Sequence, residues 1–217
     1  MAAVVRRSLE KLRDRLDCHV VAVEYPGYGL LKAEDPKEES INRAVREVFE
    51  ELTGPMGWSP RSVVVMGRSL GSGPAARLAR EREVGALLLL APFTSVKEIA
   101  GDIVGDTIAT VLNLVQWNNR AQLKRVTCPT LLLHGLKDGV VPHVHSLELY
   151  RACRATMKYV ALLRDSDHNR INWPVACDVY AKPFLQLACS HGMNRSLGVS
   201  AEDVTALSQF RPSSFLG

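Results

Sequence analysis

The stretch that decides the fold is SVVVMGRSLGSGPAARLARE, residues 62–81. Its apolar start predicts a buried strand over 62–66, and the alanine-rich run that follows predicts a helix over 70–81. Between them stands Gly67-Arg-Ser-Leu-Gly71, which has the form Gly-X-Ser-X-Gly. A serine nucleophile on a sharp strand-to-helix turn needs glycines on both sides, because side chains there would clash across the turn. We therefore predict that Ser69 is a nucleophile; a turn of small packing residues is the alternative interpretation.

Strands and helices alternate on both sides of this stretch. Further short apolar runs predict strands at 19–23, 85–90, 130–133 and 158–163. Apolar residues spaced as on one face of a helix predict helices at 3–16, 41–52, 143–155 and 173–189. Pro183 is expected to kink or split the last of these helices. Apolar strands that alternate with helices indicate the α/β class, with a mostly parallel sheet and helices on both faces.

Length and composition agree with one soluble globular domain. The chain has 217 residues, of which 47% are apolar and 23% are charged. The net charge of +4 comes without a basic tract, so we expect no nucleic-acid partner. No apolar run approaches the length of a transmembrane segment, so any membrane contact is expected to be peripheral. The five cysteines are scattered and odd in number, which indicates reduced thiols in a cytoplasmic protein.

A serine hydroxyl at neutral pH needs a positioned base, and six histidines are available. His168 follows the last predicted strand and a short loop, where a base can reach the carboxyl end of a central strand. His143 and His145 begin a predicted helix and are expected to lie on the surface. His134 ends a predicted strand, and we expect it to shape a loop beside the site rather than to transfer protons. We therefore predict that His168 is the base.

The acid that orients this histidine is expected to follow the strand between the nucleophile and the base. Asp138 stands there, after the apolar strand at 130–133 and a turn. A carboxylate at this position would hold the imidazole in one tautomer and stabilise its protonated form. Asp165 and Asp167 are alternatives because they are close to His168 in the sequence. We favour Asp138, since neighbours within one short loop are more often surface charges.

Five motifs follow one another as in the α/β-hydrolase-domain proteins: EYPGYG at 24–29, GRSLGSG at 67–73, APFTS at 91–95, LHGLKD at 133–138 and DHN at 167–169. Over about residues 2–190 the chain resembles the serine aminopeptidase-like branch, which includes the protein depalmitoylases. The resemblance implies an α/β-hydrolase domain over residues 1–190. It also implies Ser69 as nucleophile, Asp138 as acid, His168 as base and the Leu70 amide as an oxyanion donor. The tail at 191–217 has no periodicity and is expected to be disordered.

The chain departs from this family at its start, because it begins at the helix that follows the family's third strand. It therefore lacks the usual first three strands and the loop that supplies the second oxyanion donor. The predicted strand at 19–23 would then face a gap in the sheet or pair directly with the strand at 62–66. The simplest explanation is that the chain is a truncated form of a longer enzyme.

The segment from Val96 to Ala121, where this fold often inserts a cap, carries an apolar stripe. We expect the stripe to pack on the sheet, and a wall for an acyl chain is the alternative interpretation. Its residues are Ile99, Ile103, Ile108, Leu112 and Val115.

The predicted activity is that of a serine hydrolase that cleaves carboxylic esters or thioesters, including protein S-acyl thioesters, through an acyl-enzyme. Its partner would be an acyl ester or thioester substrate, including a lipidated protein. This chemistry requires neither a metal nor an organic cofactor. The alternative is a truncated, catalytically impaired hydrolase-like protein with a binding or regulatory role. A nucleotide-binding protein is excluded, since the Gly67–Gly73 loop lacks the lysine of a phosphate-binding loop.

Overall fold

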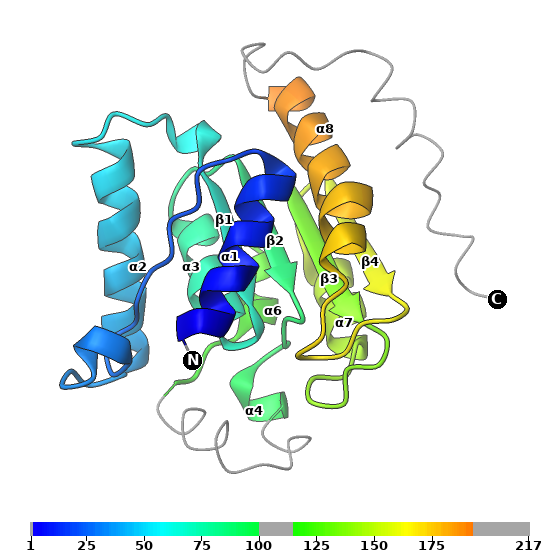
Figure 1. The fold of residues 1–217 in the computed structure, drawn as a ribbon, viewed down its shortest axis with the longest axis horizontal. Helices are drawn as coiled ribbons and strands as arrows, with labels where there is room; N and C mark the ends of the chain where they lie inside the picture. Colours follow the sequence, from blue (N-terminus) through cyan, green and yellow to red (C-terminus); the bar gives the residue numbers. More distant parts are fainter. Residues whose placement is uncertain (1, 100–114, 193–217) are drawn as a thin grey trace.

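The computed structural model describes residues 2–99 and 115–192. Its centre is a parallel sheet of four strands in the order β1-β2-β3-β4 (Figure 1). The strands are β1 Val64–Arg68, β2 Ala86–Leu90, β3 Thr130–Gly135 and β4 Lys158–Leu163. Because all four are parallel, their carboxyl ends lie at one edge of the sheet. The predicted parallel α/β architecture is confirmed.

Helices cover both faces of this sheet. One face is covered by α2 Glu38–Thr53, α3 Ser72–Glu81, α6 Asn119–Leu123 and α7 Val144–Ala152. The other is covered by α1 Ala2–Leu16, the π-helix η4 Val175–Ala181 and α8 Lys182–Gly192, and α1 and α8 lie in front of the sheet in Figure 1. The short elements are α4 Val96–Ile99 and the 3₁₀ turns η1 Gly29–Leu31, η2 Pro60–Ser62 and η3 Ser69–Gly71.

The strands are buried on both faces, which explains why they read as continuous apolar runs. Leu87 and Leu89 of β2 pack in a cluster with Phe49 of α2. Leu88, their neighbour in the chain, points to the opposite cluster, which contains Phe184 of α8. Successive side chains of a strand point to opposite faces, so one apolar run supplies both cores.

The predicted strand at 19–23 is wrong. His19–Val23 forms no strand in the structure, and Val21 is 57% exposed. The segment therefore neither pairs with β1 nor joins the sheet at all. Valine-rich runs favour strands because they pack on a pleated surface with neighbours. This run has no neighbouring strand among the described residues, so its composition alone does not hold it in a sheet.

The last helix is split, as Pro183 predicted. The chain forms the π-helix η4 up to Ala181, and α8 begins at Lys182, directly before the proline. Proline lacks an amide proton and its ring displaces the carbonyl one turn earlier, so the regular hydrogen-bond pattern changes there.

A third apolar cluster lies at the carboxyl end of the sheet. Ile99 and Val115, the two ends of the predicted stripe, are buried in it, and Leu70 packs against it. The other stripe residues, Ile103, Ile108 and Leu112, lie outside the described residues, as does most of the tail at 191–217.

Candidate active site

The serine motif forms a sharp turn between β1 and α3. Ser69 has a φ of 49°, in the left-handed region that a residue with a side chain adopts only at a cost. Gly67 makes the turn possible, since a β-carbon there would lie 2.3 Å from the carbonyl oxygen of Gly71 and 2.7 Å from the β-carbon of Ala75. The predicted clash therefore holds at Gly67. At Gly71 the prediction is wrong, because the nearest atom to a β-carbon there is the Tyr25 hydroxyl oxygen at 3.4 Å, an ordinary contact.

Hydrogen bonds from buried side chains fix the backbone of this turn. The hydroxyl of Ser72 donates to the carbonyl of Ser69 over 2.6 Å. The side-chain amide of Asn119 donates to the Ser72 hydroxyl and to the carbonyl of Phe93, both over 2.9 Å. The strained conformation of Ser69 is thus fixed by a hydrogen-bonded chain that reaches helix α6.

Tyr25, from the EYPGYG motif, lies close to Gly71 of the turn. Its hydroxyl is 3.4 Å from the position that a β-carbon on Gly71 would take. Burial, with a smaller contribution from Tyr28, raises the pKa of Tyr25 to about 12, so this phenol stays neutral.

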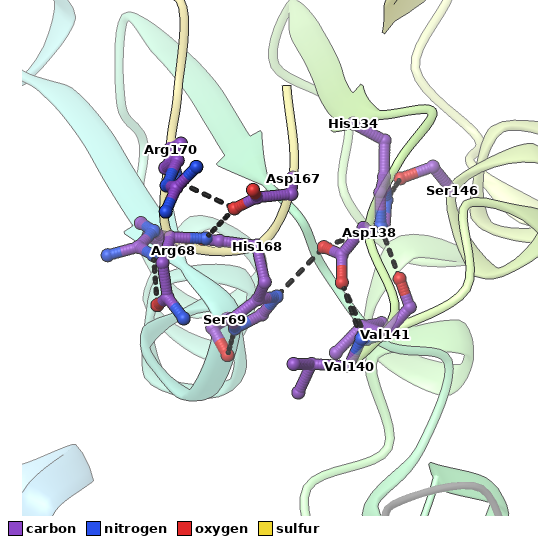
Figure 2. Close-up of polar contacts among 11 residues, drawn as sticks. Arg68, Ser69, His134, Asp138, Val140, Val141, Ser146, Asp167, His168 and Arg170 are labelled. Atoms are coloured by element: carbon purple, nitrogen blue, oxygen red, sulfur yellow. Dashed lines mark hydrogen bonds and ion pairs between the residues drawn. The ribbon is translucent and has the colours of Figure 1, made fainter. Parts of the chain in front are cut away.

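The structure brings Ser69, Asp138 and His168 into one line of hydrogen bonds (Figure 2). The Ser69 Oγ lies 3.0 Å from Nε2 of His168. The Nδ1 of the same ring lies 2.8 Å from Oδ2 of Asp138. Ser69 follows β1, Asp138 follows β3 and His168 follows β4, so the parallel sheet places all three at the carboxyl ends of its strands. This arrangement can move a proton from the hydroxyl to the imidazole.

Asp138 is ionised in a buried position. Burial by itself raises the pKa of the carboxyl group, but hydrogen bonds from His134 and His168 and from the amides of Val141 and Val140 outweigh burial and hold this pKa well below its usual range. The two amides donate to Oδ1 over 2.8 and 2.9 Å. The carboxylate therefore faces His168 in its charged form.

The alternative acids, Asp165 and Asp167, have other partners. Asp165 pairs with Lys137 over 2.9 Å on the surface. Asp167 accepts from the backbone amides of Asn169 and Arg170, each over 2.8 Å, which shapes the turn around His168. These two amides lower the pKa of Asp167.

Several residues of the site were not predicted, or were predicted differently. Arg68, beside the serine, donates to the carbonyl of His168 (Figure 2). His145 was expected on the surface but is buried, with Nδ1 2.8 Å from the Thr94 hydroxyl. The position of His145 at the start of a helix does not indicate its burial. The burial is explained by the contact with Thr94, which is distant in the sequence.

A cleft in the described part of the chain lies away from Ser69. It has a volume of about 1000 Å³ and is lined by residues such as Gly85, Pro129 and Met157, which precede β2, β3 and β4. The cleft therefore lies at the amino ends of these strands, whereas Ser69, Asp138 and His168 lie at the carboxyl ends. Two of its arginines are paired with carboxylates, Arg61 with Glu83 over 2.7 Å and Arg82 with Glu50 over 2.6 Å. The cleft thus contributes no group to the line of hydrogen bonds through Ser69, His168 and Asp138, which is called the reactive line below.

Residues 2–99 and 115–192 contain neither a candidate metal site nor a helix that could span a membrane. In these ranges no group of three or more His, Cys, Asp or Glu residues is arranged to hold a metal ion. Within the same ranges, no helix is both long and apolar enough to span a bilayer.

Comparison with solved structures identifies the fold. The crystal structure of a monoacylglycerol lipase from Paleococcus ferrophilus superposes with a TM-score of 0.58 at 17% identity, covering 85% of this chain and 90% of that one. The chain therefore has an α/β-hydrolase fold, of which the described sheet forms part.

Curated relatives narrow the class. The human alpha/beta hydrolase domain-containing protein 17B is 29% identical over 143 residues, 66% of this chain and 48% of that protein. The alpha/beta hydrolase domain-containing protein aho-3 of Caenorhabditis elegans is 28% identical over 143 residues, 66% of this chain and 42% of that protein. The chain thus spans about half the length of the curated relatives it matches. No family model matches the chain. The predicted resemblance to α/β-hydrolase-domain proteins is confirmed.

Proposed function

We propose that the protein is a serine hydrolase that cleaves carboxylic esters or thioesters through an acyl-enzyme. The observation that carries this proposal is the line of hydrogen bonds from Asp138 through His168 to Ser69, with contacts of 2.8 and 3.0 Å. Nucleophile, base and orienting acid within hydrogen-bond reach are the arrangement that activates a serine hydroxyl.

The reaction begins when Oγ of Ser69 attacks the acyl carbon and its proton passes to Nε2 of His168. The ionised Asp138 stabilises the imidazolium that forms. The amide of Leu70 donates to the oxyanion. The alcohol or thiol then leaves with the proton of His168, so that the acyl group remains on Ser69. A water molecule, deprotonated by His168, attacks this ester and releases the carboxylic acid and the serine hydroxyl.

Two observations support an acyl substrate with an apolar chain. Leu70 and Val140 connect the reactive line to the buried apolar cluster at the carboxyl end of the sheet. The sequence also resembles a branch of the family that includes protein depalmitoylases. We propose S-acyl thioesters on proteins as the favoured substrates, met by peripheral contact with a membrane. The scattered, odd-numbered cysteines support a cytoplasmic location.

Labelling with a fluorophosphonate probe, read by intact mass, tests the proposal. We expect one adduct on the native protein and none on Ser69→Ala. Ser62→Ala is the matched control, because that serine is exposed and precedes β1, whereas Ser69 follows it, so its removal should not change labelling. Soluble, cooperatively folded protein without an adduct would contradict the proposal and favour a binding or regulatory role.

The substrate class is tested next, with p-nitrophenyl esters of increasing chain length and an S-palmitoylated peptide. We expect turnover to rise with acyl length and to disappear in Ser69→Ala. Equal turnover of acetyl and long-chain esters would argue against an apolar acyl site.

A further inference from the structure

His134 is a buried histidine next to the proposed reactive line. Its side chain is fully buried, at the end of strand β3 and four residues before Asp138. Nδ1 lies 2.7 Å from the hydroxyl of Ser146 on α7, and Nε2 lies 2.8 Å from the carbonyl oxygen of Val141. Figure 2 shows Asp138 between this ring and that of His168.

The partners of the ring fix its tautomer. A carbonyl oxygen can only accept, so Nε2 of His134 carries a proton and donates it to Val141. In the neutral ring, Nδ1 is then an acceptor and receives the hydroxyl proton of Ser146. The ring is thereby held on both sides, with its Nε2–H directed at the loop that carries Asp138.

This Nε2–H acts on Asp138 by two routes. The Nε2 nitrogen lies 3.4 Å from Oδ2 of Asp138, the same oxygen that accepts the hydrogen bond from Nδ1 of His168. It also binds the carbonyl of Val141, whose own amide donates to Oδ1 of Asp138 over 2.8 Å. One proton therefore restrains both the carboxylate and the backbone that holds it.

We propose that His134, held by Ser146, is a positioning residue that aims Oδ2 of Asp138 at Nδ1 of His168. This inference rests on the proposed function for its kinetic consequence, but its structural claim stands on the contacts alone. A histidine that merely filled the core would need no directed donor, and an apolar residue could replace it. A positioning histidine can be replaced only by a residue that returns a donor at Nε2.

Three variants separate these roles. His134→Leu removes both contacts, while His134→Gln returns an N–H group close to the position of Nε2. His143→Gln is the matched control, because His143 lies between Asp138 and Ser146 in the chain and its side chain makes none of these contacts. Circular dichroism and thermal unfolding show whether each variant folds, and rates are compared for the folded proteins.

The kinetic measurement is fluorophosphonate inactivation, resolved into the inhibitor constant and the maximal rate. We expect His134→Leu to lower the maximal rate about 10- to 100-fold, with the inhibitor constant unchanged, and His134→Gln to recover most of the loss. Ser146→Ala should lower the rate about fivefold in the native background and add nothing in His134→Leu, because it acts through the ring. An unchanged maximal rate in His134→Leu would overturn the proposal.

A spectroscopic measurement tests the inference even if the proposed function fails. The proton on Nδ1 of His168, bonded to Asp138, gives a far-downfield proton NMR signal that His168→Gln identifies by its loss. We expect the signal to vanish in His134→Leu, to return in His134→Gln and to persist in His143→Gln. Native protein that is not labelled but shows this pattern would refute the hydrolase and support the positioning role. A signal that persists in His134→Leu would overturn the positioning role, whatever the labelling shows.

Discussion

At the scale of single residues, the site depends on a carboxylate that is buried and charged. Asp138 keeps its charge because two histidines and two amides supply hydrogen bonds that offset the cost of burial. Its folded pKa is therefore lower than the value of 3.8 for an unperturbed aspartate. A lowered folded pKa means that the ionised group stabilises the fold above the unfolded pKa, and that this contribution is lost as pH falls through the folded pKa.

The prediction concerns the stability of Asp138→Asn against that of the native protein. We expect the native protein to be the more stable above about pH 5, with a constant difference up to neutrality, and the difference to shrink as pH falls below 3.8. Urea unfolding at several pH values measures this. Asp165→Asn is the control, since that side chain is 68% exposed and its removal should change stability by less than about 0.5 kcal/mol. A stability difference between the native protein and Asp138→Asn that grows as pH falls would refute the conclusion that Asp138 is ionised in the folded protein.

A second prediction at this scale concerns Gly67. In Gly67→Ala the new β-carbon meets the carbonyl of Gly71 and the side chain of Ala75, so the turn must open. We expect a loss of about 1–3 kcal/mol in unfolding free energy and slower labelling of Ser69. Gly139→Ala is the matched control, because nothing lies within 4 Å of its β-carbon position. Equal stability of the two variants would show that the turn is looser than described.

Ser69, Asp138 and His168 could be predicted because each has a suitable side chain and follows a predicted strand. Ser69 stood between two glycines after an apolar run, and Asp138 and His168 each followed a predicted strand, so all three could be named before the fold was known. His134 was expected to shape a loop beside the site, but its contacts with Val141 and Ser146, 7 and 12 residues away, were not predicted. The role of Ser72 was not predicted either, because it depends on Asn119, 47 residues away. A single sequence records the residue type at such positions but does not show which groups meet.

At the scale of elements, the site depends on loops that are tied to one another. Arg68, the last residue of β1, donates to the carbonyl of His168 and lies 3.5 Å from the Asn169 side-chain oxygen. The serine turn and the histidine loop, about 100 residues apart, are thus joined by one side chain. Because the sheet fixes only the strand ends, this contact helps to set the distance between the two loops.

We expect Arg68→Met to slow the labelling of Ser69 about tenfold, while the apolar stem of the side chain is retained. Arg61→Met is the matched control, since Arg61 precedes the same strand and makes an exposed ion pair with Glu83. Such pairs contribute little to stability, so the control should label at the native rate. If both variants label at the native rate, the two loops are held by the sheet alone.

Elements with neighbours were predicted well, and the element without one was not. The strand at 158–163 was placed at its observed bounds, because β4 pairs with β3 along its whole length. The run at 19–23 has an equally strand-like composition, yet it forms no strand. Composition measures how well a segment would pack in a sheet, while pairing decides whether it does.

At the scale of the whole molecule, the sheet has a protected centre and two edges in the described residues. All residues of β2 are buried, and β2 has a strand on each side, whereas β1 pairs with β2 alone and Val64 is 36% exposed. Amides that open only by global unfolding exchange slowest, and those at edges and in irregular segments exchange faster. The architecture therefore implies a gradient of protection from the centre of the sheet outward.

Hydrogen exchange followed by mass spectrometry tests this gradient. We expect the slowest exchange in β2 and β3, faster exchange in β1, and the fastest of the four segments at 19–23. Protection of 19–23 equal to that of β2 would mean that this run joins the sheet in solution, contrary to the structure. Protection of β1 that rises with protein concentration would instead mean that a second copy covers its open edge. The measurement is then repeated after fluorophosphonate labelling. We expect a phosphonylated Ser69 to slow exchange at the end of β1 and to leave exchange in β2 unchanged.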